Sequence, residues 1–421
     1  MSKPKAFYPF FQVGRIGEIA MRIPKARNLF PESQYDLTIL LPDAHFPTAN
    51  QAVIDILCRG IRMMHVTSEQ MAKEIFQRAH AEDPRSIWID PDPAANYIEY
   101  LNRFHDQPRN YFANLSREDV EKGWQIRQKL GIPRHARIVT CHVREAGYLD
   151  LKRDMSYHGY RNASIENLFY ALIYLMKRGY WVVRLGDSSM LPLKDLPDHL
   201  IDAPFHPDYE PFFDPYFIAS SDFYLGMLSG PNTLAGAFGI PQLLTNVPLS
   251  CASEENDGDM MIPKKYYSHQ LGRMLTYEEI MMSPILDFNR QYLYQESEIE
   301  VIENSSTEIF AAVWEMEMRL NNAYPFREEA ELSHARVKEI QKKAHLWRQS
   351  TLTPDHYPHY PFVASYLLKG RMSHEFIRMH PGYLGHDFPR IAWGFHPRVE
   401  GLPARLEAFH RERMGLGEEK C

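Results

Sequence analysis

Arg144 directly follows the apolar, β-branched run of residues 136–143, which contains His142, and directly precedes Glu145. An arginine at the end of a strand can bind phosphate through two parallel, charge-assisted hydrogen bonds. In a doubly wound sheet, the loop that follows the first strand faces the ligand crevice. We therefore expect Arg144 to bind an anion, with His142 and Tyr148 beside it. The alternative is a surface loop in which Arg144 pairs with Glu145 in solvent.

A second polar cluster, Tyr160, Arg161 and Asn162, comes just before Ser164, which can cap a helix over residues 165–178. Aromatic, guanidinium and amide groups beside a helix N-terminus suit an anionic or a sugar ligand. A loop packed by its own tyrosines explains the same residues equally well.

The strand predicted at 222–226 leads into Ser229 and Gly230, and Pro231 fits the first turn of a helix. Free backbone N–H groups at the positive end of this helix favour phosphate, and Asn232 is close by. Neither a Walker motif nor GxGxxG occurs, which disfavours a P-loop or dinucleotide site. We favour ligand contact here; the alternative is a tight strand–helix joint that needs small residues.

The strand predicted at 180–186 contains Arg184 and leads through Gly186 to Asp187. Asp187 could bind a ribose or sugar hydroxyl, and a turn-forming role is an equal alternative. Arg184 is a second choice, after Arg144, for binding an anion.

Two glycines, Gly14 and Gly17, flank Arg15 after the first predicted strand. Glycine lets the backbone approach a ligand closely. Glu18 could act as a general base directed toward the ligand. A carboxylate at the start of a helix explains Glu18 more simply.

Other polar groups are explained without a ligand. The acidic run at 254–259 lacks the spacing of an EF-hand, so a solvated loop is favoured over a cation site. The histidines after residue 350 lack HExxH spacing, which favours packing and surface roles over zinc binding. Ser305 and Glu308 form a capping-box pattern, and this role competes with ribose binding by Glu308.

The candidate residues lie at the ends of predicted strands, and helices alternate with these strands. Strands are predicted at 5–13, 35–41, 86–90, 136–143, 180–186, 222–226, 241–245 and 298–302. Helices are predicted at 68–80, 116–130, 165–178, 214–219, 231–238 and 305–320. This alternation predicts parallel sheets that are covered on both faces. We expect an α/β protein with two Rossmann-like domains, 1–133 and 134–325, a ligand between them, and a helical and irregular extension, 326–421, that packs on the core.

The composition limits the classes of protein to consider. The chain has 421 residues, a formal charge of −7 and 44% hydrophobic residues, which suits a globular protein of two or three domains. The acidic balance disfavours binding to nucleic acid. Four scattered cysteines without a CxxC pair disfavour a zinc ribbon or a disulfide framework and fit a reducing cytoplasm. No signal-peptide core is present, and no apolar stretch approaches the ~20 residues that span a bilayer.

Taken in order, the segments resemble a family of bacterial glycosyltransferases associated with surface-polysaccharide gene clusters. The matching segments are 14–18, 141–148, 160–167, 181–187, 225–246, 261–267 and 303–317. The segment 141–148 also resembles the strand-end motif of fucosyltransferases and protein O-fucosyltransferases, and 229–241 is similar to the donor domain of heptosyltransferase-like enzymes. The resemblance implies a GT-B fold, in which the second of two Rossmann-like domains holds most of the nucleotide-sugar donor.

By this resemblance, Arg144 lies where the fucosyltransferase arginine meets the donor pyrophosphate. Two positions depart from the family patterns. Arg144 is followed by Glu-Ala-Gly-Tyr, where the fucosyltransferase pattern is Arg-x-Gly-Asp. Glu18 stands where the polysaccharide family has histidine in its glycine loop. The donor sugar is therefore left open.

We expect a glycosyltransferase that moves a sugar from a nucleotide-sugar to a saccharide, lipid-linked or protein acceptor in surface glycan biosynthesis. We expect no metal or cofactor, since GT-B enzymes usually stabilise the departing diphosphate by fixed positive groups. Arg144 is the first candidate for that role, and Glu18 or Glu145 could be the base of an inverting reaction. The alternatives are a sugar-nucleotide epimerase or hydrolase of the same fold and a non-catalytic scaffold that binds nucleotide-sugar. The expected location is the cytoplasm, and peripheral attachment to the inner membrane is compatible with the sequence.

Overall fold

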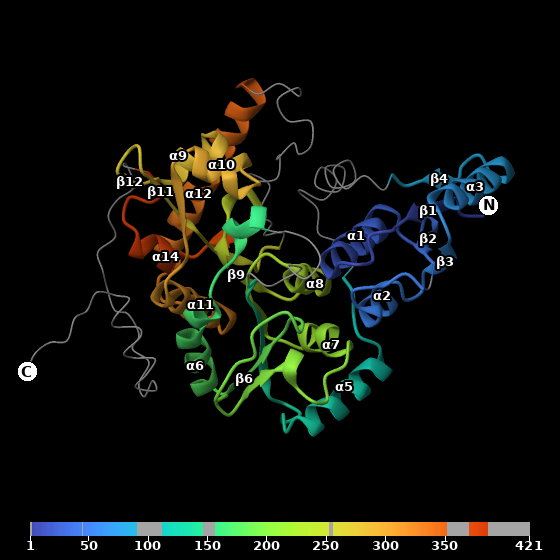
Figure 1. The fold of residues 1–421 in the computed structure, drawn as a ribbon, viewed down its shortest axis with the longest axis horizontal. Helices are drawn as coiled ribbons and strands as arrows, with labels where there is room; N and C mark the ends of the chain where they lie inside the picture. Colours follow the sequence, from blue (N-terminus) through green and yellow to red (C-terminus); the bar gives the residue numbers. More distant parts are fainter. Residues whose placement is uncertain are drawn as a thin grey trace, which may run out of the picture.

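The structure is a computed structural model that describes residues 2–43, 45–90, 112–145, 156–251, 256–351 and 370–385. These residues form two parallel β-sheets, of four and seven strands, and one three-stranded antiparallel sheet. Helices flank the sheets, and the four-stranded sheet forms a lobe at one end of the molecule (Figure 1). The expected α/β class with two parallel sheets is confirmed.

The four-stranded sheet has the strand order β3-β2-β1-β4, and its neighbouring strands are parallel. Its elements are β1 (Lys5–Pro9), α1 (Ile16–Leu29), β2 (Asp36–Pro42), α2 (Gln51–Leu57), β3 (Arg62–Val66), α3 (Glu69–Glu82) and β4 (Ile87–Trp88). A helix after each of the first three strands carries the chain back, so that the next strand can run in the same direction.

The seven-stranded sheet has the order β14-β10-β9-β8-β5-β6-β7, and its neighbouring strands are also parallel. Its strands are β5 (Arg137–His142), β6 (Tyr180–Arg184), β7 (Leu200–Asp202), β8 (Phe223–Gly226), β9 (Gln242–Val247), β10 (Met260–Pro263) and β14 (Arg371–Met372). The helices of this part are α5 (Arg117–Lys129), α6 (Phe169–Lys177), α7 (Phe213–Ala219), α8 (Gly230–Phe238), α11 (Ser306–Leu320), α12 (Arg327–Thr351) and α14 (His374–Met379). Two 3-10 helices, η1 (Ser156–Arg161) and η2 (Ile165–Leu168), precede α6.

The antiparallel sheet has the order β12-β11-β13, and it follows β10 along the chain. Its strands are β11 (Lys265–Ser268), β12 (Arg273–Met274) and β13 (Ile299–Ile302), with α9 (Tyr277–Met281) and α10 (Gln291–Glu296) between β12 and β13. The strand expected at 298–302 therefore exists, but it pairs with β11 and lies outside the parallel sheets.

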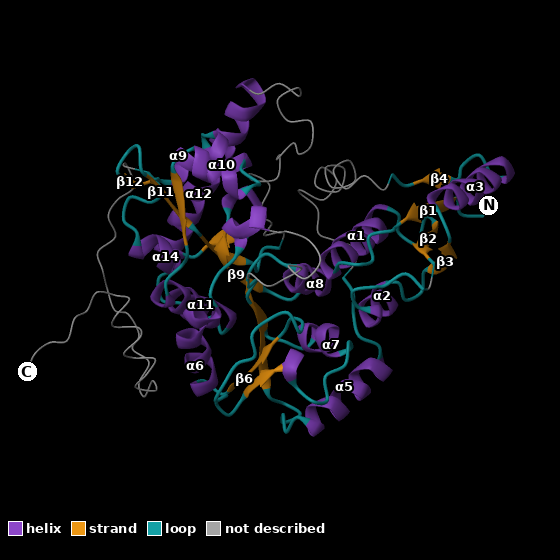
Figure 2. Ribbon diagram, viewed as in Figure 1, coloured by secondary structure: helices purple, strands orange, loops and turns teal. Residues whose placement is uncertain are grey.

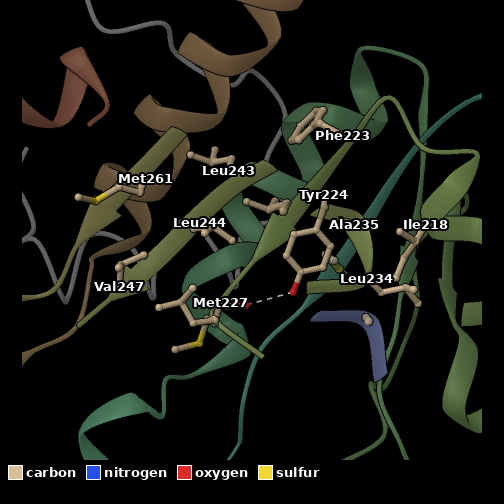
Figure 3. Packing of buried hydrophobic residues seen from close by; sticks show 14 of the residues in the cluster. Ile218, Phe223, Tyr224, Met227, Leu234, Ala235, Leu243, Leu244, Val247 and Met261 are labelled. Atoms are coloured by element: carbon tan, nitrogen blue, oxygen red, sulfur yellow. Dashed lines mark hydrogen bonds between the residues drawn. The ribbon is translucent and has the colours of Figure 1, made fainter. Parts of the chain in front are cut away.

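Apolar side chains fill the space between the seven-stranded sheet and its helices. Leu243 and Leu244 of β9 are fully buried, and so is Ala235 of α8. Figure 3 shows Tyr224 of β8 beside α8, and its hydroxyl donates to the carbonyl oxygen of Met227 at 3.3 Å. This bond satisfies a buried polar atom and also fixes the loop between β8 and α8.

The sequence predicts no range for helix α1, although Glu18 is interpreted as a carboxylate at the start of a helix. Pro24 lies inside it. A proline removes one backbone hydrogen bond, so the local pattern favours a break rather than a helix. The helix is nevertheless stabilised by tertiary packing, because Ile19 and Ile23 on its buried face belong to the main hydrophobic core. Helix α2 and strands β3, β7, β10 and β14 of the parallel sheets are also absent from the predicted elements.

Helix α5 precedes the predicted domain boundary at residue 133 and packs against α7 of the seven-stranded sheet, with Gly123 directly against the ring of Tyr216. The boundary itself stays a prediction. Within the predicted extension, residues 370–385 add strand β14 to the edge of the seven-stranded sheet and place α14 against α11.

The contact between α5 and α7 requires a glycine. A Cβ atom on Gly123 would lie 1.8 Å from Cε2 of Tyr216. Although alanine is favoured over glycine in a helix by ~1 kcal/mol, we expect Gly123→Ala to lower the free energy of unfolding by ~1–2 kcal/mol, because the overlap must be relieved. Urea denaturation measures this change. Gly258→Ala is the control, since its new Cβ would lie 3.8 Å from the nearest atom; equal stability of Gly123→Ala and wild type would contradict the packing described.

Candidate functional site

The strand order of the seven-stranded sheet reverses beside β5. The chain runs from β5 outward to β6 and β7 and then crosses to β8, on the opposite side of β5. Ligands of open parallel sheets bind outside the carboxyl ends of the strands at such a switch point. Arg144 follows β5 and Ser229 follows β8, so both lie where a ligand is expected.

The glycine loop of the four-stranded sheet reaches the same place. A Cβ atom on Gly17 would lie 3.4 Å from Cα of Gly230, and a Cβ atom on Gly230 would lie 3.2 Å from the backbone nitrogen of Gly17. Helices α1 and α8 therefore begin next to each other, and both lie between the two parallel sheets (Figure 2). The N-terminus of a helix carries partial positive charge, so the contact joins two electropositive helix ends.

A hydrogen-bonded chain holds the side chain of Arg144. Its Nε atom donates to Oδ1 of Asn162 at 3.1 Å, and its carbonyl oxygen accepts the N–H of Ala163 at 3.2 Å. Lys264, which is buried, donates from Nζ to the carbonyl oxygen of Asn162 at 2.6 Å. Burial lowers the pKa of Lys264 to about 8, against the opposing charge of Glu303. These bonds orient the guanidinium before any ligand arrives.

Arg161 links the two loops at the switch point. Its Nη2 atom donates to the carbonyl oxygen of Leu228 at 3.1 Å, directly before Ser229. Its Nε atom is buried and has no hydrogen-bond partner among the described residues. A buried donor without an acceptor is costly, and an anionic ligand could supply that acceptor.

The half-buried side chain of His158 lies in a strongly positive environment. Burial and the charges of Arg161, Arg144, Arg290 and Arg15 lower the pKa of His158 to about 4, because a protonated imidazole would be repelled. Arg144 follows β5, Arg290 precedes α10 and Arg15 precedes α1, so the charges come from both parallel-sheet halves of the protein. This convergence suits an anion of more than one negative charge.

Arg184 and Glu145, two other candidates, bind each other. Arg184 is fully buried; its Nη2 atom donates to Oε1 of Glu145 at 2.7 Å, and its Nη1 atom donates to Oδ1 of Asp202 at 3.0 Å. Oε2 of Glu145 accepts the N–H of Leu191 at 3.0 Å. Both side chains therefore support the loops after β5 and β6.

Asp187 and Tyr160 also have local partners. Oδ1 of the exposed Asp187 accepts the N–H of Ser189 at 2.8 Å, which is the geometry of a turn. Tyr160 is buried, its ring centroid lies 5.3 Å from that of Tyr294, and its hydroxyl lies 3.5 Å from Sγ of Cys251. The contacts of Asp187 are therefore those of a turn-forming residue, and the contacts of Tyr160 are those of a packed tyrosine.

Glu308 caps helix α11. Its Oε2 atom accepts the N–H of Ser305 at 2.6 Å, and Oγ of Ser305 accepts the N–H of Glu308 at 3.3 Å, so the predicted capping box is confirmed. Oε1 of Glu308 accepts from Nζ of Lys265 at 2.6 Å and also from Nε2 of His380. Burial raises the pKa of Glu308, but the bond from His380 and the charge of Lys265 outweigh it and lower the pKa to about 2. Ribose binding by Glu308 stays a prediction.

Glu18 lies in the first turn of α1, where its Oε2 atom accepts from Nε of Arg22 at 2.7 Å. Arg22 also donates from Nη2 to Oε1 of Gln12 at 2.9 Å. Arg15 is exposed, and Gly14 has open space where a Cβ atom would lie. Among the described residues, none lies against Gly14, so the loop before α1 is exposed in this part of the chain.

Ser229, His142 and Gly186 lie at or near strand ends and make local contacts or adopt a local conformation there. The N–H of Ser229 donates to Oδ1 of Asn232 at 2.7 Å, within the first turn of α8. Nδ1 of His142 lies 2.9 Å from the carbonyl oxygen of Leu185. Gly186 has a φ of +151°, a conformation that favours glycine.

Two sequence expectations fall partly outside the described residues, which exclude Tyr148 and residues 252–255. The expectation of a solvated acidic loop is wrong at Asp259, which is fully buried and accepts the N–H groups of Gln242 and Asn256 at 3.2 and 3.1 Å. The described part of the chain has no group of three or more His, Cys, Asp or Glu that could hold a metal ion. In the same part of the chain, none of the helices combines the length and the apolar character needed to cross a bilayer.

Arg290 and Lys264 are missing from the residues predicted by sequence. Arg290 stands before α10, away from every predicted strand end, so no pattern marks it. Lys264 and Lys265 are adjacent in a segment that matches the glycosyltransferase family, but their order alone does not show that Lys264 is the one beside Asn162.

Two parallel α/β halves, joined by the loops at the carboxyl ends of their strands, define a protein of GT-B architecture. Among solved structures, the chain is similar to a glycosyl transferase family 9 protein from Veillonella parvula, with 10% identity, coverage of 76% of this chain and 99% of that chain, and a TM-score of 0.48. It is similar to the E. coli ADP-heptose lps heptosyltransferase II, with 11% identity, coverage of 62% and 90%, and a TM-score of 0.39. It is also similar to a putative UDP-N-acetylglucosamine 2-epimerase from Listeria monocytogenes, with 12% identity, coverage of 58% and 80%, and a TM-score of 0.27.

No protein-family model matches the chain, and neither does any curated protein. Similarity at these levels of identity assigns no activity, so the function must be argued from the site.

Substitution of the buried Arg184 tests whether its ion pairs with Glu145 and Asp202 stabilise the protein. Arg184→Met would leave the carboxylate of Asp202 buried without its cation, and we expect a loss of ~3–5 kcal/mol in the free energy of unfolding. Arg137→Met is the matched control at the other end of a neighbouring strand. The side chains of Arg137 and Asp222 are 39% and 31% exposed, so breaking that ion pair should cost under ~1 kcal/mol. Similar losses for the two variants in urea denaturation would contradict a structural role specific to Arg184.

Proposed function

We propose that the protein is a glycosyltransferase that uses a nucleotide-sugar donor and binds the donor diphosphate at the switch point of the seven-stranded sheet. One observation carries the proposal: Arg144 and Arg161 lie at the switch point, bonded to Asn162 and to the loop before α8. Together with Arg15 and Arg290, their charges lower the pKa of His158. A diphosphate offers several acceptor oxygens, and guanidinium groups bind such oxygens in pairs.

The chemistry of sugar transfer explains why these charges are useful. The bond from the sugar to the diphosphate must break, and negative charge then develops on the departing phosphate oxygen. Groups that are fixed beforehand stabilise that charge without the cost of reorganisation. Arg144 meets this condition, since Asn162 and Lys264 hold its segment in place. The N-terminus of α8 at Gly230 would add a partial positive charge.

The acceptor is proposed to bind beside residues 14–18, on the four-stranded-sheet side of the site. It would be a saccharide, a lipid-linked sugar or a protein, in surface glycan synthesis on the cytoplasmic side of the membrane. If the reaction inverts the sugar, Glu18 is the better candidate for the base, because both oxygens of Glu145 already accept hydrogen bonds. Glu18 would have to leave its ion pair with Arg22 to act.

Binding of the donor can be tested without knowledge of the acceptor. A ligand that binds only the folded state raises the melting temperature. UDP, GDP, ADP, CMP and dTDP, and then the sugar conjugates of the nucleotide that binds, form a suitable panel. If none of the nucleotides binds, the proposed function is wrong. Conversion of a bound donor without an acceptor would indicate an epimerase or hydrolase, and binding without any turnover would indicate a scaffold.

Arg144→Ala tests the catalytic claim. Loss of one group that stabilises developing charge typically costs 10²–10³-fold in rate, so we expect at least a ~100-fold loss of sugar transfer with an unchanged melting temperature. Arg62→Ala is the matched control, because Arg62 is an exposed arginine of β3 whose ion pair with Asp36 spans 4.0 Å. Wild-type turnover by Arg144→Ala would remove Arg144 from the mechanism.

A further inference from the structure

The charges of Arg161, Arg144, Arg290 and Arg15 all act on His158, which has no catalytic or binding role in the function argued so far. Its Nδ1 atom is buried and has no hydrogen-bond partner among the described residues. The rings of Tyr157 and Tyr160 lie on either side of it in sequence, with centroids 4.2 and 6.2 Å from the imidazole. The Tyr157 ring also lies 4.9 Å from the guanidinium carbon of Arg290.

Among the described residues, the charges that act most strongly on His158 are all positive. They come from Arg161 in the same segment, Arg144 after β5, Arg290 before α10 and Arg15 before α1. An imidazole in this position stays neutral while the site is empty, because burial and the four guanidiniums oppose a further positive charge. A bound anion would reverse this balance, since an opposite charge close to a histidine favours its protonated form.

We propose that His158 is a proton-coupled contact of the bound diphosphate: it takes up one proton from solvent when the anion enters and donates a hydrogen bond to a phosphate oxygen. This inference rests on the proposed function, because it assigns His158 and one bound proton to the same diphosphate site. The protonated imidazole would stay beside the diphosphate as the sugar bond breaks, and the proton would return to solvent when the nucleotide product leaves.

The proposal predicts that the affinity for a nucleotide-sugar rises as the pH falls. The protein groups around His158 lower its pKa to about 4. If anion binding restores it to about 6.5, the bound state carries the proton below that pH while the empty state does not. Affinity for a nucleotide-sugar should therefore rise about tenfold between about pH 7.5 and pH 5.5. The diphosphate of a nucleotide-sugar does not titrate in that range, so the ligand itself does not contribute.

The first experiment uses sulfate as a simple dianion and needs no knowledge of the donor. The protein is labelled with ¹³C-histidine, and the His158 signal is assigned by its absence in His158→Asn. Between about pH 5 and pH 7.5, we expect this signal to stay at its neutral position in sodium chloride and to titrate in sodium sulfate of equal ionic strength. A His158 signal that titrates equally in both salts, or in neither, would overturn the proposal.

The second experiment measures proton uptake with the donor. Calorimetric titration of the nucleotide-sugar that binds, at about pH 6 in MES and in Bis-Tris, should show uptake of roughly three quarters of a proton by the wild-type protein. We expect His158→Asn to bind without this uptake, and His135→Asn, at an exposed histidine, to keep it. Donor binding without proton uptake would contradict the proposed role of His158 but would leave the proposed function intact. Absence of binding by every nucleotide-sugar would instead refute the proposed function, even if sulfate moves the His158 signal.

Discussion

The approach of Gly17 to Gly230 is the constraint on which the site depends. Each glycine lies so close to the backbone of the other that a Cβ atom on Gly230 would come within 3.2 Å of its neighbour. This contact sets the beginning of α1 against the beginning of α8 and so places Arg15 near groups that belong to the seven-stranded sheet. A second link between the halves lies at Asn50, whose Nδ2 atom donates to Oδ2 of the buried Asp214 at 3.0 Å.

Two sets of hydrogen bonds and ion pairs hold the positively charged groups at the switch point in place. Arg144 is oriented through Asn162, and Asn162 is held in turn by the buried amine of Lys264. Beneath the loops, the fully buried Arg184 of β6 binds both Glu145 and Asp202, and so joins the loop after β5 to β6 and β7. Repulsion among converging guanidiniums is unfavourable in the empty protein, and these interactions hold the groups in place despite it. Positive groups that are fixed in this way are the arrangement that favours a departing diphosphate.

The sequence predicts most strands of the parallel sheets, because these strands are short apolar runs that end in polar residues. It does not predict β3, β7, β10 or β14. The capping box at Ser305 and Glu308 is likewise a local pattern, and the structure contains it. A helix start at Glu18 is considered, but the extent of α1 is not predicted, because Pro24 is unfavourable inside a helix and tertiary packing outweighs that local preference. For the candidate site, Arg144 follows β5 at the switch point, and the loop that carries Arg161 meets the one that carries Ser229. Arg290 cannot be found in this way, since the chain brings it to the site only through the fold.

The position of the bound diphosphate tests the central claim most directly. Crystals soaked with sodium selenate would locate the anion by anomalous scattering. Separate crystals, grown with the nucleotide-sugar that binds, would locate the diphosphate by its electron density. The account predicts that both lie at the switch point, in contact with Arg144 and Arg161 and next to His158 and the start of α8. A diphosphate bound elsewhere on the protein, with Arg144 and Arg161 unchanged and unoccupied, would contradict it.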